Sequence, residues 1–139
     1  MKDVIAFLAI LILVLFFPAQ FILNQVNYYR IVNAQNIVYS YAQKARYDGG
    51  FSESTKNSIR NDLLNRYPGL SGSDIIINAD APVKYNRGAP FDSSAMIYFS
   101  VKFPIKNILA MPFLFGLSES DNKKEYEIRG KVMSEVLQP

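Results

Sequence analysis

Few side chains in this sequence could carry out catalysis or hold a metal ion. The chain has neither His nor Cys, so it lacks the commonest general base, the commonest transition-metal ligand and every thiolate. The carboxylates that remain include Asp80 and Asp92, which lie with Asn86 and Ser93 in the segment 80–94. These four side chains could form a ligand loop, and Asp80 and Asp92 could be the carboxylates of an enzyme cleft.

We favour a solvated loop for the segment 80–94. It is rich in Pro, Gly, Asp and Asn, and its acidic residues do not follow the spacing of a calcium-binding EF-hand. The chain also lacks a phosphate-binding glycine loop and a GxSxG motif. We therefore expect no catalytic residue, no metal ion and no cofactor, and a protein that is not an enzyme.

The charge pattern argues against a nucleic-acid partner. The net charge is only +3, and the longest run of basic residues is the pair Lys123–Lys124. Aromatic and basic residues do not alternate along a binding stripe. The length of 139 residues suits one small domain with one additional segment.

That additional segment is an apolar stretch near the N-terminus. Every residue from Val4 to Ala19 is apolar, and three more apolar residues follow Gln20. As a helix, Val4–Leu23 would span roughly 30 Å, about the thickness of the hydrocarbon core of a bilayer. A buried core helix is disfavoured because the segment is apolar on all sides. A cleaved signal peptide is disfavoured because no small-residue cleavage site follows the apolar run. We predict a membrane helix with its N-terminus inside; a plain signal anchor is the main alternative.

The helix is predicted to continue beyond the membrane to about residue 47. Neither Gly nor Pro interrupts the chain between Leu23 and the Asp48-Gly49-Gly50 sequence, where a glycine can take the left-handed conformation that ends a helix. Pro18 is the only internal breaker, and we expect a kink or a locally extended turn there. A small domain can cover only one side of so long a helix, which predicts partner helices on the others.

A small α+β domain is predicted to follow. A second helix is expected at 53–66 from its helical apolar stripe. Strands are expected at Asp74–Ala79, which contains a short β-branched run, and at Met96–Phe103 and Lys124–Glu135, where apolar and polar residues alternate. Pro104 is expected to end the second strand.

The predicted fold class is therefore α+β: a long hydrophobic N-terminal helix kinked near Pro18, a short helix and a three-stranded antiparallel sheet. We divide the chain into 1–50, the anchor or filament-core helix with its membrane part at 4–23, and 51–139, a small extracytoplasmic domain.

The apolar stretch Ile108–Leu117 has neither helical nor strand periodicity. Two interpretations are equally open. It could meet a neighbouring subunit or the membrane surface, or it could fold back onto the sheet.

This layout resembles that of type IV pilins and pseudopilins: an apolar N-terminus, one very long helix with an internal proline, and a small β domain. It is most similar to the TadE-like branch of tight-adherence systems and to related small Gram-positive pilin-like proteins. The resemblance extends over nearly the whole chain, but it lies in the general pattern of the segments and not in a diagnostic motif. The similar stretches are Asp3–Leu23, AQKARYDGGFSE at Ala42–Glu53, Met96–Phe103 and Glu125–Glu135.

The chain departs from the pilin pattern at the N-terminus. Type IV pilins usually carry Glu at the fifth mature position, where it neutralises the amine of a neighbouring copy, whereas this chain has Ile5 and its nearest acid is Asp3. Asp3 could pair with the amine of Met1 of another copy, or simply lie at the membrane interface. The resemblance implies that Met1 follows a removed leader; an initiating Met1 would weaken it.

The resemblance implies a structural subunit of an extracellular type IV pilus-like filament, built by packing of the N-terminal helices. The residues expected in the filament core or membrane helix are Asp3, Ile5, Leu8, Leu11, Leu13, Leu15, Phe16, Pro18 and Phe21. The candidate subunit contacts are Tyr28, Tyr39, Met111, Phe113 and Phe115.

The expected partners are other copies of the chain, the membrane, the pilus assembly machinery and a prepilin peptidase. The expected location is a prokaryotic cell membrane before assembly and a cell-surface filament afterwards. The alternative is a non-polymerising single-pass accessory protein, a pseudopilin, of a secretion or conjugation apparatus.

Overall fold

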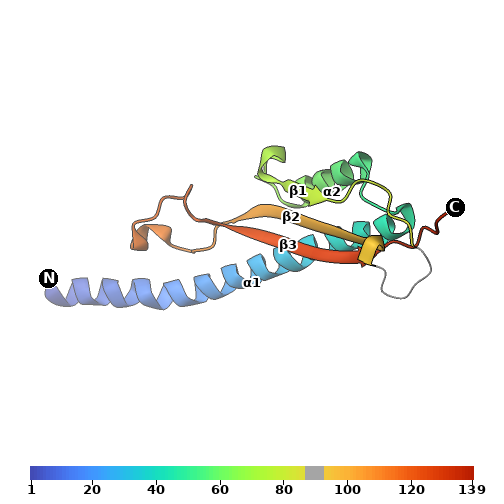
Figure 1. The fold of residues 1–139 in the computed structure, drawn as a ribbon. Coiled ribbons are helices and arrows are strands. Elements are labelled where there is room, and N and C mark those ends of the chain that lie inside the picture. Colours follow the sequence, from blue (N-terminus) through green and yellow to red (C-terminus); the bar gives the residue numbers. More distant parts are fainter. Residues whose placement is uncertain (87–92) are drawn as a thin grey trace. The chain divides into compact units, whose positions relative to one another are not determined.

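The structure, a computed structural model, describes residues 1–86 and 93–139. Its element order is helix α1, helix α2, strand β1, strand β2 and strand β3, with three short 3₁₀ turns between them (Figure 1). The chain forms two compact units. Unit 1 comprises Met1–Ile31 and Ile105–Lys124, and unit 2 comprises Val32–Pro104 and Glu125–Pro139. The predicted α+β class is confirmed.

Helix α1 runs over Lys2–Asp48 and contributes to both units. It ends at Gly49, whose φ of 80° is left-handed, so the predicted helix end is confirmed. A Cβ at Gly49 would also lie 2.7 Å from a methyl group of Val83, so the turn needs glycine for space as well. The chain stays helical through Pro18, and the locally extended turn that we allowed for there is not found.

Helix α2, Glu53–Arg66, has the predicted bounds because its capping signals are local. The Oγ of Ser52 accepts a hydrogen bond from the backbone N–H of Thr55 at 3.1 Å, and Glu53 favours the positive end of the helix dipole. Ile59 and Leu63 lie one turn apart on one face and are completely buried. This face attaches α2 to the rest of unit 2.

The sheet has the strand order β1-β2-β3, with β1 at Ile76–Ala79, β2 at Met96–Lys106 and β3 at Lys123–Met133. In the antiparallel β1–β2 pair, Ile77 lies opposite Val101. The odd-numbered side chains of β2 face the core, as the alternating pattern predicted, and they are all buried: Ile97, Phe99, Val101, Phe103 and Ile105.

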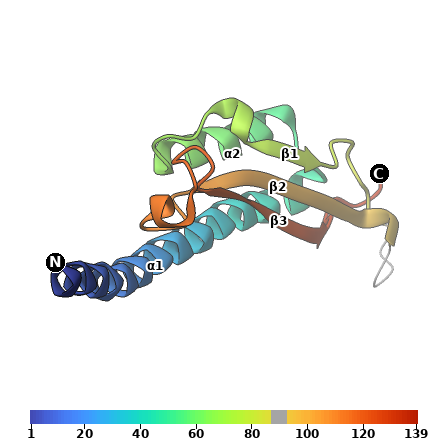
Figure 2. The ribbon, with the colours of Figure 1, turned by 90° about the vertical axis from the view of Figure 1, so that its left-hand side faces the viewer.

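Both helices pack against this sheet within unit 2. The rings of Tyr39 on α1 and Phe51 before α2 lie 5.9 Å and 5.5 Å from the ring of Phe99. Tyr41 on α1 donates a 2.7 Å hydrogen bond to the Asp62 carboxylate on α2, and that bond raises the pKa of Tyr41. Figure 2 shows α2 beside β1 and the later part of α1 along β2 and β3.

The prediction that Pro104 ends the second strand is wrong, because β2 continues to Lys106. The backbone C=O of Tyr98 accepts a hydrogen bond from the backbone N–H of Asp80, so the backbone groups of residue 98 point toward the β1 edge of β2. Backbone groups alternate between the two edges of a strand, so those of residue 104, six positions later, point toward the same edge. Strand β1 pairs only as far as Lys102, so no β1 partner stands opposite Pro104. Its missing N–H therefore costs the sheet no ladder bond.

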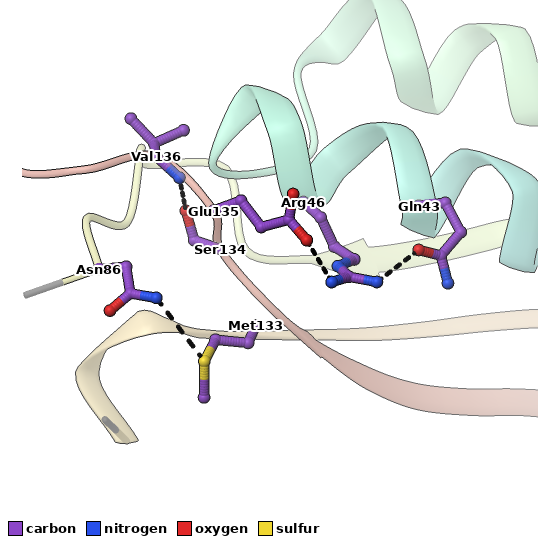
Figure 3. Close-up of polar contacts among 7 residues, drawn as sticks. All are labelled: Gln43, Arg46, Asn86, Met133, Ser134, Glu135 and Val136. Carbon is purple, nitrogen blue, oxygen red and sulfur yellow. Dashed lines mark hydrogen bonds and ion pairs between the residues drawn. The ribbon is translucent and has the colours of Figure 1, made fainter. Parts of the chain in front are cut away.

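The C-terminal segment closes unit 2 near the end of α1 (Figure 3). Arg46 lies between the side chains of Gln43 and Glu135 and pairs with the Glu135 carboxylate. The backbone N–H of Glu135 donates to the C=O of Arg46 at 2.8 Å, and that of Asn86 to the C=O of Val136 at 2.7 Å. The predicted loop 80–94 is thus partly docked at residues 80–86, and residues 87–92 lie outside the described part of the chain.

Candidate functional site: the apolar surface of unit 1

The most unusual surface of the molecule is the first half of α1. Between residues 4 and 22 its large apolar side chains are exposed on every side of the helix, from 40% for Leu11 to 68% for Phe17. Exposing so many side chains to water would cost on the order of 10 kcal/mol, since burying one fully contributes about 1.5–3 kcal/mol. We call residues 4–22 the bare apolar stretch; it requires an apolar environment from outside the chain.

By length and composition, α1 is long enough and apolar enough to cross a membrane, and it is the one helix among the described residues that meets this test. A signal sequence near an N-terminus meets the same test. None of the most apolar part of α1 is buried, unlike the core helix of a soluble protein.

The predicted filament-core residues all lie along this part of α1, mostly exposed to solvent. The exposed ones are Asp3, Ile5, Leu8, Leu11, Leu13, Leu15, Pro18 and Phe21, and Phe16 is half-buried. Asp3 lies in the first turn, where its charge suits the helix dipole. Its pairing with the Met1 amine of another copy stays a prediction.

Phe16 is the predicted core residue with a partner inside the chain. Its ring lies 5.8 Å from the ring of Phe115, which belongs to the apolar stretch 108–117. We call residues 108–117 the apolar loop. Of the two interpretations left open for this loop, folding back onto the sheet is not what the structure shows, because the loop contacts Phe16 and Gln20 on α1, within unit 1. Contact with a neighbouring subunit or the membrane surface stays a prediction.

Three side-chain amides hold the apolar loop. Gln20 on α1 donates to the C=O of Ile108 at 2.9 Å and accepts from the N–H of Ala110 at 3.0 Å. Asn122 accepts from the N–H of Leu109 and donates to its C=O, both at 2.8 Å. Asn27 donates to the C=O of Asn107 at 3.0 Å.

Sequence reasoning missed these amides. Asn27 and Asn122 are almost completely buried, as polar groups are only when hydrogen-bonded. The one available signal was Gln20, the first polar residue after the apolar run.

The candidate subunit contacts divide between the two units. Phe113 and Phe115 are 70% and 58% exposed at the tip of the apolar loop, and Met111 is half-buried. Tyr28 is exposed in unit 1, beside Tyr29. Tyr39 belongs to unit 2, where its ring already packs on Phe99, so part of its surface serves the core of the domain.

A shallow hollow of about 660 Å³ in unit 2 is lined by both apolar and charged residues, and the charged ones include Asp80, Glu127 and Arg129. Hydrogen bonding and the charge of Arg129, 2.5 Å away, hold the pKa of Glu127 below its usual range. Partial burial alone would raise the pKa of the Asp80 carboxyl group. Hydrogen bonds from Lys84 and from the Tyr98 N–H lower it by more, so the pKa of Asp80 is also below its ordinary value. Neither carboxyl group is therefore tuned to act as a general acid near neutral pH.

Of the remaining candidate ligands, Asn86 and Ser93 do not line this hollow. Asn86 is held by the C-terminal segment and Ser93 lies in a 3₁₀ turn, while Asp92 is outside the described residues. Within residues 1–86 and 93–139, no three acidic, His or Cys side chains come together as a metal site.

Comparison with known proteins gives no relative on which to base a function. No protein-family model, no curated protein and no solved structure matches the chain. The geometry of unit 1 must therefore carry the functional argument.

Proposed function

We propose that the chain is a structural subunit of an extracellular type IV pilus-like filament, held in a prokaryotic cell membrane by Val4–Leu23 before assembly. The observation that supports this proposal is the bare apolar stretch, which is exposed around the whole helix. A helix apolar on one side would need one partner, whereas this one needs lipid or several other helices.

Lipid and a bundle of other copies are equivalent environments for such a helix. Moving α1 from lipid into a helix bundle exchanges one set of apolar contacts for another, so little hydrophobic free energy opposes the transfer. The chain can thus be stored in the membrane and assembled from it. In this proposal unit 2 faces outward, and the assembly machinery and a prepilin peptidase are the partners that the pilin resemblance implies.

The test compares intact chain in filaments sheared from cells with chain left in the membrane, for wild type and Leu13→Lys. A charge at the middle of the bare apolar stretch is expected to abolish filaments, because it would be buried unpaired in the helix bundle. Leu13→Ile, which keeps an apolar side chain of equal size, and Tyr98→Lys, on the exposed surface of unit 2, should assemble normally. Normal filament abundance for Leu13→Lys would refute the proposal.

A second candidate is a single-pass accessory protein of a secretion or conjugation apparatus that never polymerises. Ile5 favours it, because the position where the resembled pilins carry a neutralising Glu is apolar here. In that case the wild-type chain would be released only by detergent and would be missing from the sheared fraction.

A further inference from the structure

We propose that the apolar loop is a second membrane contact, which enters the outer half of the bilayer beside α1. This inference rests on the membrane insertion of α1 in the proposed function. It assigns to the loop a lipid surface as its occupant.

The position of the loop along α1 is set by contacts within unit 1. Gln20 binds the loop backbone on both sides of Leu109, and Phe16 contacts Phe115 one turn closer to the N-terminus. If Leu23 marks the edge of the hydrocarbon, Phe16 lies about 10 Å inside that edge, at 1.5 Å per residue. The ring of Phe115 must then lie at a similar depth.

The exposed chemistry of the loop fits that depth. Phe113, Leu114, Phe115 and Leu117 are all at least 40% exposed, and they continue the surface of the bare apolar stretch. Such a cluster on an irregular loop would be costly in water, whereas in lipid it contributes favourable transfer free energy.

Several backbone N–H and C=O groups of the loop also have hydrogen-bond partners within unit 1. Unbonded N–H and C=O groups cost several kcal/mol in lipid, so an irregular segment there needs its own partners. Gln20 and Asn122 pair four backbone groups between Ile108 and Ala110. At the tip, Leu114, Gly116 and Leu117 donate to the carbonyl groups of Met111, Phe113 and Pro112.

Polar groups follow the apolar tip in the order that a bilayer requires. Lys106, Lys123 and Lys124 lie where the loop joins β2 and β3, and Tyr28 and Tyr29 are exposed on α1 about 8–9 Å beyond Leu23. Lysine and tyrosine are common at the headgroup level. Glu119 and Asp121 offset two of the three lysine charges, so membrane binding must come mainly from the apolar tip.

The chain has no native Trp, so a single tryptophan reports on one site. We would place the full chain in phosphatidylcholine vesicles containing lipids brominated at shallow or deep acyl positions. The three variants are Phe113→Trp at the loop tip, Phe17→Trp on the bare apolar stretch and Tyr98→Trp on unit 2. All three positions are more than half exposed, so none of the changes disturbs the core.

We expect Phe113→Trp to be quenched several-fold more than Tyr98→Trp, and with the same relative response to shallow and deep bromines as Phe17→Trp, because Phe17 is adjacent to Phe16, which contacts the loop. Quenching of Phe17→Trp without quenching of Phe113→Trp would overturn the loop contact and leave the anchor intact. No quenching at either position would overturn the membrane anchor as well. Emission from Phe113→Trp that shifts with protein-to-lipid ratio but not with bromine would assign the loop to a second copy, against this proposal.

A fourth variant tests the role of Gln20 as a positioning residue. Gln20→Met in the Phe113→Trp background removes both hydrogen bonds to the loop while keeping side-chain length. We expect the quenching of the tryptophan to lose its match to the depth preference of Phe17→Trp, since the loop no longer has a fixed depth. An unchanged preference would contradict a role for this clamp.

Discussion

The two halves of α1 are both helical, yet they are stabilised differently. In residues 32–48, Ala34, Val38, Ala42 and Ala45 form a narrow stripe that is completely buried in unit 2. In residues 4–22, larger side chains cover every side and none is buried. The stripe in residues 32–48 packs against other residues of the chain, whereas the apolar side chains of residues 4–22 are left largely uncovered by the described part of the chain. The two regions therefore differ both in total hydrophobicity and in how far the apolar surface extends around the helix.

The largest expected difference between the two regions comes from the same substitution made in each. Phe99→Ala should lower the free energy of unfolding of unit 2 by about 3–5 kcal/mol, because the ring is buried between Tyr39 and Phe51. Phe17→Ala removes an exposed ring and should leave that free energy unchanged. Urea unfolding of the detergent-solubilised chain, followed by tyrosine fluorescence, measures both. Equal effects would mean that the bare apolar stretch is buried by the chain itself.

A smaller effect tests how closely the core of unit 2 is packed. A Cβ on Gly130 would lie 2.9 Å from ring carbons of Phe99, so Gly130→Ala forces the ring to move. We expect a loss of about 1–3 kcal/mol in the free energy of unfolding. Gly72→Ala is the control, because its nearest new contact would be 3.7 Å away, at the Arg60 side chain. Equal unfolding midpoints for the two variants would show that the ring of Phe99 can move aside without loss of stability.

The smallest expected effect is electrostatic and depends on pH. Since the folded-state pKa of Asp80 lies below the unfolded value of about 3.9, its charged form stabilises unit 2 above that pH. The contribution is lost as the pH falls through the folded-state pKa. Asp80→Asn should cost at most about 1 kcal/mol at pH 7, since the pair with Lys84 is partly exposed to solvent. The measurement is the difference in urea midpoint between wild type and variant at pH 7 and at pH 3. A difference that is as large at pH 3 would show that the charge is not its cause.

Those parts of the fold that depend on local signals could be predicted from the sequence. Ser52 and Gly49 act through neighbouring backbone, so the limits of α2 and the end of α1 were predictable. The alternation along β2 likewise identified its buried face. Pro104 could not be interpreted in this way, because its effect depends on where β1 stops pairing, and β1 lies more than twenty residues earlier in the chain.

The apolar loop shows the same limit at the candidate site. Its composition marked it as unusual, but its conformation depends on Gln20 and Asn27, which are about ninety and eighty residues away in sequence. No periodic pattern reports such contacts, since each is a single amide that binds a backbone group. The bare apolar stretch was predictable because a long helix that is apolar on all sides can be identified from length and composition alone.

The C-terminal segment described above also bears on how the protein would respond to a protease. Unit 2 is made of two pieces of chain, joined covalently through residues 105–124. Strand β3 pairs with β2, and Glu135 and Val136 are hydrogen-bonded to Arg46 and Asn86. A single cut within residues 112–120 should therefore yield two fragments that remain associated under native conditions and separate only in denaturant. Such a nicked protein would keep unit 2 folded, and the two fragments, expressed separately, should reconstitute it by complementation.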